Sequence, residues 1–250
     1  FIDLKSANYG VIMSSSSNVT FNNALMVSSR QLSWGFIFAH NDSNVFISNS
    51  LFANATSKYT TAVKGAKTTI IKNCTFINLH SNITAGAIGI KDIEECEIDN
   101  CTFINVTSEK NAGAIFADAY AQTEFKQVFI NNSNFVDCYS GFGGAILQLG
   151  GNLTVDNCNF TNNSALFDGG AIYTSYVIVS LSNSTFKENH AKYDGGERST
   201  FGGAIFCDLS GFNLIDCELD YNSAQSGGAV YLYDSNYYIE NKTYTEVMSI

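Results

Sequence analysis

The chain has 250 residues, of which 45% are hydrophobic, with 20 glycines and no proline, so it has material for a core and no Pro-rich linker. Its formal net charge of −10 argues against binding to nucleic acid or to an anionic membrane surface, because both require clustered lysine and arginine. No apolar run approaches the roughly 18 residues that span a bilayer, so we expect one domain over residues 1–250, part of a longer chain and without a transmembrane segment.

Two short signals alternate along the chain. The first is Gly-Ala-Ile, which occurs as AGAI at 85–88 and 112–115, as GGAI at 143–146, 169–172 and 202–205, and as GGAV at 227–230, with weaker versions at Val11, Phe36 and Ala62. The second is Asn-x-x-Phe, whose first residues are Asn18, Asn49, Asn73, Asn100, Asn132, Asn157, Asn183, Asp216 and Asn241. The period is about 28 residues, and each unit offers short β-type runs without a helical stretch. This pattern predicts an all-β fold, a right-handed parallel β-helix of about nine coils.

Side-chain alternation within each unit gives the register. The residues four and two before each Asn are mostly apolar and should point inward: Val45 and Ile47, Thr69 and Ile71, Cys96 and Ile98, Val128 and Ile130, Leu153 and Val155, Val179 and Leu181, Phe212 and Leu214, Tyr237 and Ile239. The next inward residue is three positions after the Asn, as in Phe76 and Phe103. The change of phase predicts a two-residue bend at the Asn.

The Asn column is expected to be a structural ladder. Asn tolerates the left-handed backbone region, and its amide both donates and accepts hydrogen bonds. We therefore predict that the nine Asn and Asp side chains stack from coil to coil inside the solenoid. Five Asn-x-Ser/Thr sequons fall in this column, where an inward amide could not carry a glycan. Seven sequons outside the column are the candidates for glycosylation: Asn41, Asn54, Asn82, Asn105, Asn131, Asn152 and Asn162.

The two signals resemble the repeats of the polymorphic outer-membrane protein family, in which GGA plus an aliphatic residue alternates with Phe-x-x-Asn. Phe160 to Asn163, Phe186 to Asn189 and the variant Leu219 to Asn222 fit the second half. The sequence is also similar to adhesin-like surface proteins of archaea and some protists. These resemblances imply a pectin-lyase-like β-helix with a role in adhesion or the cell envelope, and they imply no catalytic residues.

The chemistry-bearing residues do not form a recognisable catalytic or metal site. The seven cysteines include no Cys-x-x-Cys pair; four of them follow the Asn column, where buried thiols are expected, although Cys74 and Cys101 on adjacent coils are within disulfide range. Glu95, Glu97 and Asp99 form an outward acidic stripe that is either solvated or a weak calcium site. The histidines are scattered, and Arg30 and Arg198 lie in separate insertions. We predict no catalytic residue, metal or cofactor.

The Gly-Ala-Ile strand is apolar on both faces. If its Ile points inward, the following residue points outward, which gives an aromatic-rich column of Phe38, Lys64, Gly89, Phe116, Leu147, Tyr173, Phe206 and Tyr231. We expect this contact strip to be covered by a flanking segment, to pack against another copy, or to stack on sugar rings.

The sequence therefore favours a non-catalytic extracellular or cell-surface module, an acidic and glycosylated adhesin or structural rod. Loops 118–127 and 190–201 are the expected recognition segments. Its predicted partners are glycans or proteins of host or neighbouring cells, or copies of itself stacked end to end into oligomers or filaments. The alternative is a polysaccharide lyase or glycoside hydrolase with the same fold.

Overall fold

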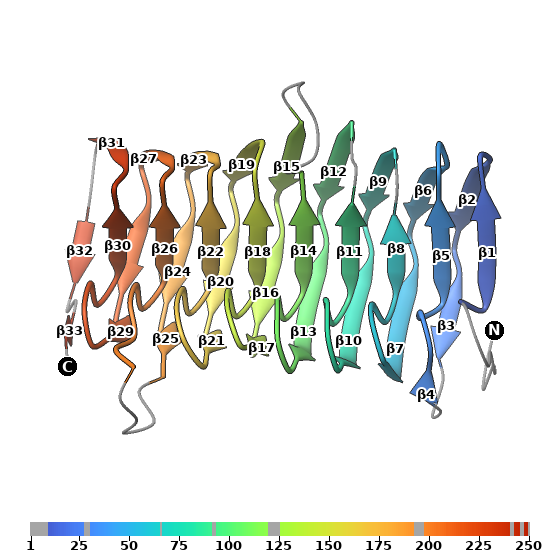
Figure 1. Ribbon diagram of the computed structural model, residues 1–250, viewed down its shortest axis with the longest axis horizontal. Helices are drawn as coiled ribbons and strands as arrows, with labels where there is room; N and C mark the ends of the chain where they lie inside the picture. The colour runs from blue at the N-terminus through green and yellow to red at the C-terminus, as the bar shows by residue number, and fades with distance from the viewer. Residues whose placement is uncertain are drawn as a thin grey trace.

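The computed structural model describes residues 10–27, 31–65, 67–91, 94–119, 126–192, 198–240, 243–245 and 248–249. These residues form strands and turns, without a helix that could span a membrane. The strands wind into a right-handed parallel solenoid whose coils follow one another along the long axis (Figure 1). The predicted right-handed parallel β-helix is therefore confirmed.

Three parallel sheets run along the solenoid. Sheet 1 contains β1 (Ile12–Ser15), β5 (Ile37–His40), β8 (Val63–Gly65), β11 (Ile88–Lys91), β14 (Ile115–Asp118), β18 (Ile146–Leu149), β22 (Ile172–Ser175), β26 (Ile205–Asp208) and β30 (Val230–Tyr233). Sheet 2 contains β2 (Asn18–Asn22), β6 (Asn44–Ser48), β9 (Thr68–Lys72), β12 (Glu95–Asp99), β15 (Gln127–Asn131), β19 (Asn152–Asp156), β23 (Ile178–Ser182), β27 (Gly211–Ile215) and β31 (Asn236–Glu240). The nine strands in each of these two sheets agree with the predicted coil number.

Sheet 3 closes each coil and is bent in most of them. It contains β3 (Leu25–Val27), β4 (Gln31–Leu32), β7 (Leu51–Ser57), β10 (Thr75–Ser81), β13 (Thr102–Ser108), β16 (Asn134–Val136), β17 (Tyr139–Ser140), β20 (Asn159–Thr161), β21 (Ser164–Ala165), β24 (Thr185–Lys187), β25 (His190–Ala191), β28 (Glu218–Asp220), β29 (Ser223–Ala224), β32 (Thr243–Thr245) and β33 (Met248–Ser249). From β16 onward each coil contributes two short strands in place of one long strand.

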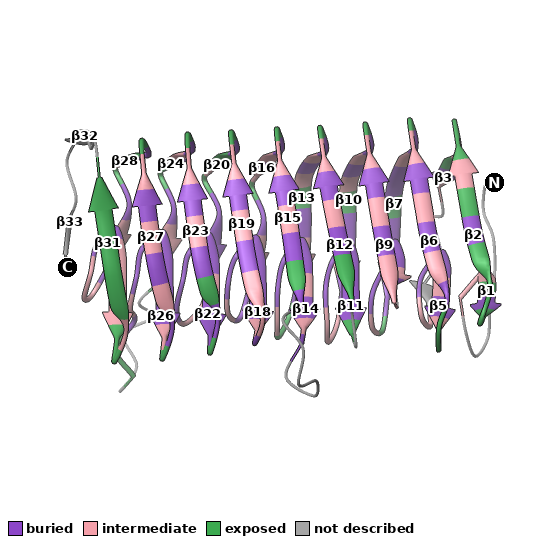
Figure 2. Cartoon of the chain, turned by 90° about the horizontal axis from the view of Figure 1, so that it is seen from above, coloured by how far each residue is buried: buried purple, intermediate pink, exposed green. Residues whose placement is uncertain are grey.

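The core is a set of columns that repeat from coil to coil. The predicted inward pairs on sheet 2 are buried from Val45 to Leu214, and the phenylalanines after the bend are fully buried. Phe52, Phe76, Phe103, Phe135, Phe160 and Phe186 form one continuous ring stack, with centroid separations of 4.6–5.0 Å. Figure 2 shows the alternation of buried and less buried residues along the strands of sheet 2.

The inward prediction does not hold for the last pair of residues. Tyr237 and Ile239 keep the register of Phe212 and Leu214 but are 68% and 41% exposed. The described part of the chain places no strand of sheet 2 beyond β31, so nothing there covers their side chains.

The predicted Asn column lies on the outside of the solenoid and forms a ladder only in part, because Asn49, Asn132 and Asn183 donate to Asn22, Asp99 and Asp156 instead of to the column. Asn49, Asn73, Asn100, Asn132, Asn157, Asn183 and Asp216 all have φ of 48–53° and all are exposed. Asn100 Nδ2 donates to Asn73 Oδ1 at 2.8 Å, and Asn157 Nδ2 donates to Asn132 Oδ1 at 2.8 Å. The left-handed backbone and the two-residue bend were predicted correctly. The interior location was wrong, because the small Ser or Cys that follows each Asn takes the inward position.

Two ends of the predicted ladder also differ. Asn18 lies at the start of β2 and pairs with Asn44, while Asn23, with φ of 55°, is the left-handed residue at the corner between β2 and β3. Asn241 lies outside the described residues. A second outer column, five residues further along each coil, has the same backbone conformation; it comprises Asn54, Asn78, Asn105, Asp137, Asn162, Glu188 and Tyr221.

A true interior ladder exists at the Phe-x-x-Asn element. Asn163, Asn189 and Asn222 have no exposed surface. Asn163 Nδ2 donates to Asn189 Oδ1 and Asn189 Nδ2 donates to Asn222 Oδ1, both at 3.0 Å. Each Oδ1 also accepts a backbone N–H, as from Asn163 to Asn189 at 3.1 Å. These amides satisfy buried backbone groups where sheet 3 bends.

The two glycines of Gly-Gly-Ala have different roles. Gly169 has φ of 66°, a conformation that costs glycine little. Gly170 faces the carbonyl oxygen of Gly203 on the next coil so closely that a Cβ would collide with it. The pair therefore lets successive coils approach at the start of each sheet 1 strand.

The interior ladder should carry a large share of local stability. Replacing Asn189 by Ala leaves the Asn163 N–H buried without an acceptor, so we expect a loss of about 2–3 kcal/mol in the free energy of unfolding, measured by urea denaturation. The matched control is Asn157→Gly on the outer ladder, which keeps the left-handed backbone and should cost under about 1 kcal/mol. Equal losses for both variants would contradict the assignment.

Candidate functional site

The outward face of sheet 1 carries the predicted contact strip. Register pairs connect Phe38, Lys64, Gly89, Phe116, Leu147, Tyr173, Phe206 and Tyr231 in one column. The preceding Ile or Val of each strand belongs to the core, from Ile37 to Ile205. The predicted orientation of this strand is therefore correct, and the column faces away from the core.

Aromatic side chains from the turns before each strand partly cover the strip. Trp34 and Tyr59 stack with centroids 3.9 Å apart, and Trp34 also contacts Phe38 at 4.9 Å. Toward the other end, Phe201 lies 4.6 Å from Tyr231. Leu147 and Phe206 are only 4% and 8% exposed, whereas Phe38, Phe116, Tyr173 and Tyr231 remain half-buried.

These covering aromatics were missed at the sequence level. Phe142 and Phe201 directly precede Gly-Gly, and Phe167 precedes it by one residue. An aromatic residue just before Gly-Gly was the available signal, because the turn that precedes each sheet 1 strand can fold its side chain over the outward column of that sheet.

Two grooves open on this face, one on each side of Phe116. The first groove, of about 240 Å³, is lined by Trp34, Tyr59, Lys64, Thr84, Gly89, Ile90, Lys91, Phe116 and Asp118. The second groove, of about 230 Å³, is lined by Asn111, Phe116, Phe142, Leu147, Leu149 and Tyr173. Gly89 contributes to the first groove because it has no side chain in the column, and a Cβ there would collide with the Thr60 hydroxyl. Concave sites with apolar and aromatic walls and a few polar groups are typical of ligand-binding sites.

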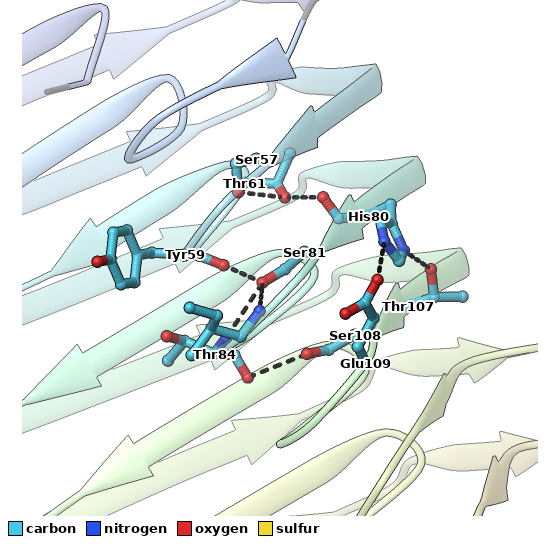
Figure 3. A network of polar contacts seen from close by, with 10 residues as sticks. Ser57, Tyr59, Thr61, His80, Ser81, Thr84, Thr107, Ser108 and Glu109 are labelled. Carbon is cyan, nitrogen blue, oxygen red and sulfur yellow. Dashed lines mark hydrogen bonds and ion pairs between the residues drawn. The ribbon is translucent and has the colours of Figure 1, made fainter. Parts of the chain in front are cut away.

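Buried hydroxyl groups fix the wall of the first groove. The Ser81 hydroxyl donates to the Tyr59 carbonyl and accepts from the N–H groups of Ile83 and Thr84 at 3.2 and 3.1 Å (Figure 3). Thr61 Oγ1 donates to the His80 carbonyl at 2.6 Å. The turns that carry Tyr59 and Thr84 are thus tied to the same buried serine, which holds the wall of the groove in place.

The same network ends at the surface with an imidazole. His80 Nδ1 lies 2.9 Å from Thr107 Oγ1, and His80 Nε2 lies 3.9 Å from Glu109 Oε1 (Figure 3). Neither His80 nor Glu109 lines either groove. This His–Glu contact is therefore separate from the aromatic face.

A cation clamps the wall of the second groove. The Arg198 guanidinium lies 5.1 Å from the Phe142 ring centre and 4.6 Å from that of Phe167, and it donates to Asp168 at 2.8 Å. The buried Asp168 carboxylate also accepts the Phe201 N–H at 3.0 Å. Burial raises the pKa of Asp168, and the nearby Arg198 opposes this rise. Through Arg198 and Asp168, the turns that carry Phe142, Phe167 and Phe201 are joined to one another.

The two predicted recognition loops lie largely outside the described residues. Of 118–127 the structure describes 118, 119, 126 and 127, and of 190–201 it describes 190–192 and 198–201. Arg30 also lies outside. Among the described residues of these segments, Asp118 lines the first groove and the Arg198 guanidinium packs on Phe142, which lines the second.

The sequons differ in accessibility. Asn41, Asn54, Asn105 and Asn162 are exposed at left-handed corners, whereas Asn82, Asn131 and Asn152 are half-buried. The Oδ1 atoms of Asn82 and Asn152 are buried without a hydrogen-bond partner. Asn73, Asn100 and Asn183 are exposed, so the inward orientation that excluded these ladder sequons from glycosylation is wrong.

The seven cysteines are buried, and the predicted acidic stripe is paired in part. All seven cysteines are buried free thiols, Cys74 and Cys101 included, and burial raises the pKa of the Cys158 thiol to about 12. Glu97 pairs with Lys72 at 2.7 Å, and Asp99 accepts from Asn132 at 2.7 Å. Among the described residues, no group of three or more His, Cys, Asp or Glu side chains could hold a metal ion.

The geometry defines a parallel β-solenoid with an aromatic face on one sheet. The family model for the right-handed β-helix region matches residues 62–244, and the chain belongs to this family. No curated protein and no solved structure matches the chain. The finer resemblance to outer-membrane repeat proteins rests on the sequence motifs alone.

Removal of the Arg198 clamp should destabilise the second groove. Arg198→Ala leaves the buried Asp168 carboxylate without its cation, so we expect a loss of about 1–2 kcal/mol in urea denaturation. Adding Asp168→Asn should restore part of this loss, because the amide needs no counter-charge. The control Lys187→Ala, on an exposed ion pair, should change stability by under about 0.5 kcal/mol. No loss in Arg198→Ala, or no recovery in the double variant, would contradict the clamp.

Proposed function

We propose that this β-helix is a non-catalytic extracellular or cell-surface module that binds saccharide chains through the aromatic face of sheet 1. The observation that carries the proposal is the pair of aromatic-walled grooves on either side of Phe116. Sugar rings present apolar C–H faces that pack on aromatic side chains, while their hydroxyl groups remain solvated or hydrogen-bonded. The grooves are open along the face of sheet 1, and this arrangement suits a long polymer better than a small ligand that requires an enclosed cavity.

The rigid rod supports an adhesive or structural role. Backbone pairing and the phenylalanine stack continue through successive coils, so the two grooves stay at a fixed separation. A polymer that contacts both grooves gains affinity from each without reordering the protein.

A polysaccharide lyase is the second candidate. Lys64, Lys91 and Asp118 line the first groove, and β-elimination requires a base near a group that neutralises the substrate. Glycoside hydrolysis is less well supported, because it requires a pair of carboxylates and Asp118 is the single carboxylate among the residues that line the two grooves.

Saccharide binding is tested by calorimetry over a panel of acidic and neutral oligosaccharides. Tyr59→Ala and Tyr173→Ala, one in each groove, should each weaken binding by about 1 kcal/mol, or roughly fivefold to tenfold. The control Tyr221→Asn removes a 41% exposed tyrosine at a left-handed corner of sheet 3 and should leave affinity unchanged. Equal affinities for all variants would refute the aromatic site. Release of unsaturated products or reducing ends by the wild type would establish the enzymatic alternative.

We also propose that N-glycans occupy exposed corner asparagines and leave sheet 1 free. In a secreted preparation from a glycosylating host, glycosidase release in heavy-oxygen water should label members of the set Asn41, Asn54, Asn73, Asn100, Asn105, Asn162 and Asn183. Asn82 and Asn152 should stay unlabelled in folded protein, because the Oδ1 atoms of their side-chain amides are buried. Label at these two sites, or none anywhere, would contradict this distribution.

A further inference from the structure

The coil that contains β30 and β31 leaves core positions uncovered. Tyr237 and Ile239 continue the inward column of Phe212 and Leu214 on sheet 2, yet they are 68% and 41% exposed. Leu232, on sheet 1 of the same coil, is only half-buried. Figure 2 shows β31 exposed along its length at one end of the row of sheet 2 strands. This end of the described solenoid is therefore an apolar surface in contact with solvent.

The coil that contains β2 and β3, at the opposite end, is covered. Val19 on β2 and Met26 on β3 hold inward positions there, since their register partners are the buried Val45 and Phe52. Val19 and Met26 are only 9% and 1% exposed. The two ends therefore differ, and the apolar surface at β31 has no matching open surface at the other end.

Strand β31 has one paired edge. It pairs in parallel with β27, and no described strand of sheet 2 lies on its other side. The backbone N–H and C=O groups of such an edge can pair with a strand of another chain. Side chains alternate along β31, with Tyr237 and Ile239 on the core face and Asn236, Tyr238 and Glu240 on the outer face. A partner strand must match this alternation.

A second copy of β31 in the antiparallel direction matches both faces. Pairing about Tyr238 places Tyr237 of one copy opposite Ile239 of the other on the core face. It places Asn236 opposite Glu240 on the outer face, where an amide can donate to a carboxylate. This register pairs all five residues of the strand and keeps the two Glu240 carboxylates at opposite ends of the junction. Charge and apolar surface are therefore both self-complementary.

We propose that this surface is the interface of a tail-to-tail dimer, in which β31 of one copy pairs antiparallel with β31 of a second copy. Each copy contributes the same strand, so the contact is isologous and closes as a dimer instead of propagating into a filament. Sheet 2 then runs through the junction, and Tyr237 and Ile239 of both copies are covered. No residue of β30 or β31 lines either groove of sheet 1, so the interface leaves both grooves open.

Light scattering coupled to gel filtration tests the dimer. The wild type should have twice the mass of one chain. Tyr237→Lys/Ile239→Lys places cations at the junction and should be monomeric at the same concentration, with an unchanged circular dichroism spectrum because both side chains are exposed in a single copy. The matched control Ile178→Lys/Tyr221→Lys alters two residues that are 49% and 41% exposed elsewhere, and it should stay dimeric. A wild type that is monomeric at every concentration, or a monomeric control, would overturn the interface.

Cysteine cross-linking tests the register. Tyr238→Cys brings one thiol from each copy to a Cα separation of about 5 Å, which permits a disulfide. With oxidised glutathione this variant should give a covalent dimer on a non-reducing gel, whereas Asn236→Cys and the wild type, whose seven cysteines are buried, should not. A dimeric Tyr238→Cys variant without the cross-link would overturn the interface. Cross-linking only in a mixture of Tyr238→Cys and Thr20→Cys would also overturn it, because Thr20 is the equivalent residue of β2 and that result requires head-to-tail stacking.

Discussion

Each coil of this protein must repeat the backbone path of the coils on either side, because parallel strand pairing fixes the register residue by residue. Side chains at equivalent positions on successive coils are therefore stacked at the spacing of neighbouring strands, and residues of the same type contact one another along the solenoid. The phenylalanine stack, the outer asparagine ladders and the interior ladder are three results of this one constraint. The aromatic column of sheet 1 is a fourth, and it faces outward.

The constraint also explains where variation is tolerated. The residue that follows each outer-ladder Asn is Ser in some coils and Cys in others, because either side chain fills the small inward space. Sheet 3 divides into two strands from β16 onward, and from β20 onward an interior Asn at Phe-x-x-Asn replaces the Leu79, Val106 or Cys138 of the earlier coils. A polar group in the core is accepted because the neighbouring coils complete its hydrogen bonds.

The aromatic face combines a repeated element with an irregular one. Repetition aligns Tyr173, Phe206 and Tyr231, whose rings stack at 5.0 and 5.8 Å. Irregularity creates the grooves: glycine at position 89 lowers one part of the column, and covering aromatics close over other parts, as Phe201 does at Phe206 and Tyr231. Recognition on a solenoid of this kind depends on departures from the repeat more than on the repeat itself.

The sequence alone determined the coil number, the strand register and the left-handed bends, because these follow from period, side-chain alternation and the chemistry of Asn and Gly. It also identified the outward column on sheet 1. It did not determine that the Asn49–Asp216 column faces solvent, since alternation cannot tell which side of a corner a bent residue takes. The clustering of Trp34, Tyr59, Lys64 and Lys91 around Gly89 was likewise decided only by the tertiary structure. These residues come from three coils, and winding the chain is what brings their side chains to one groove.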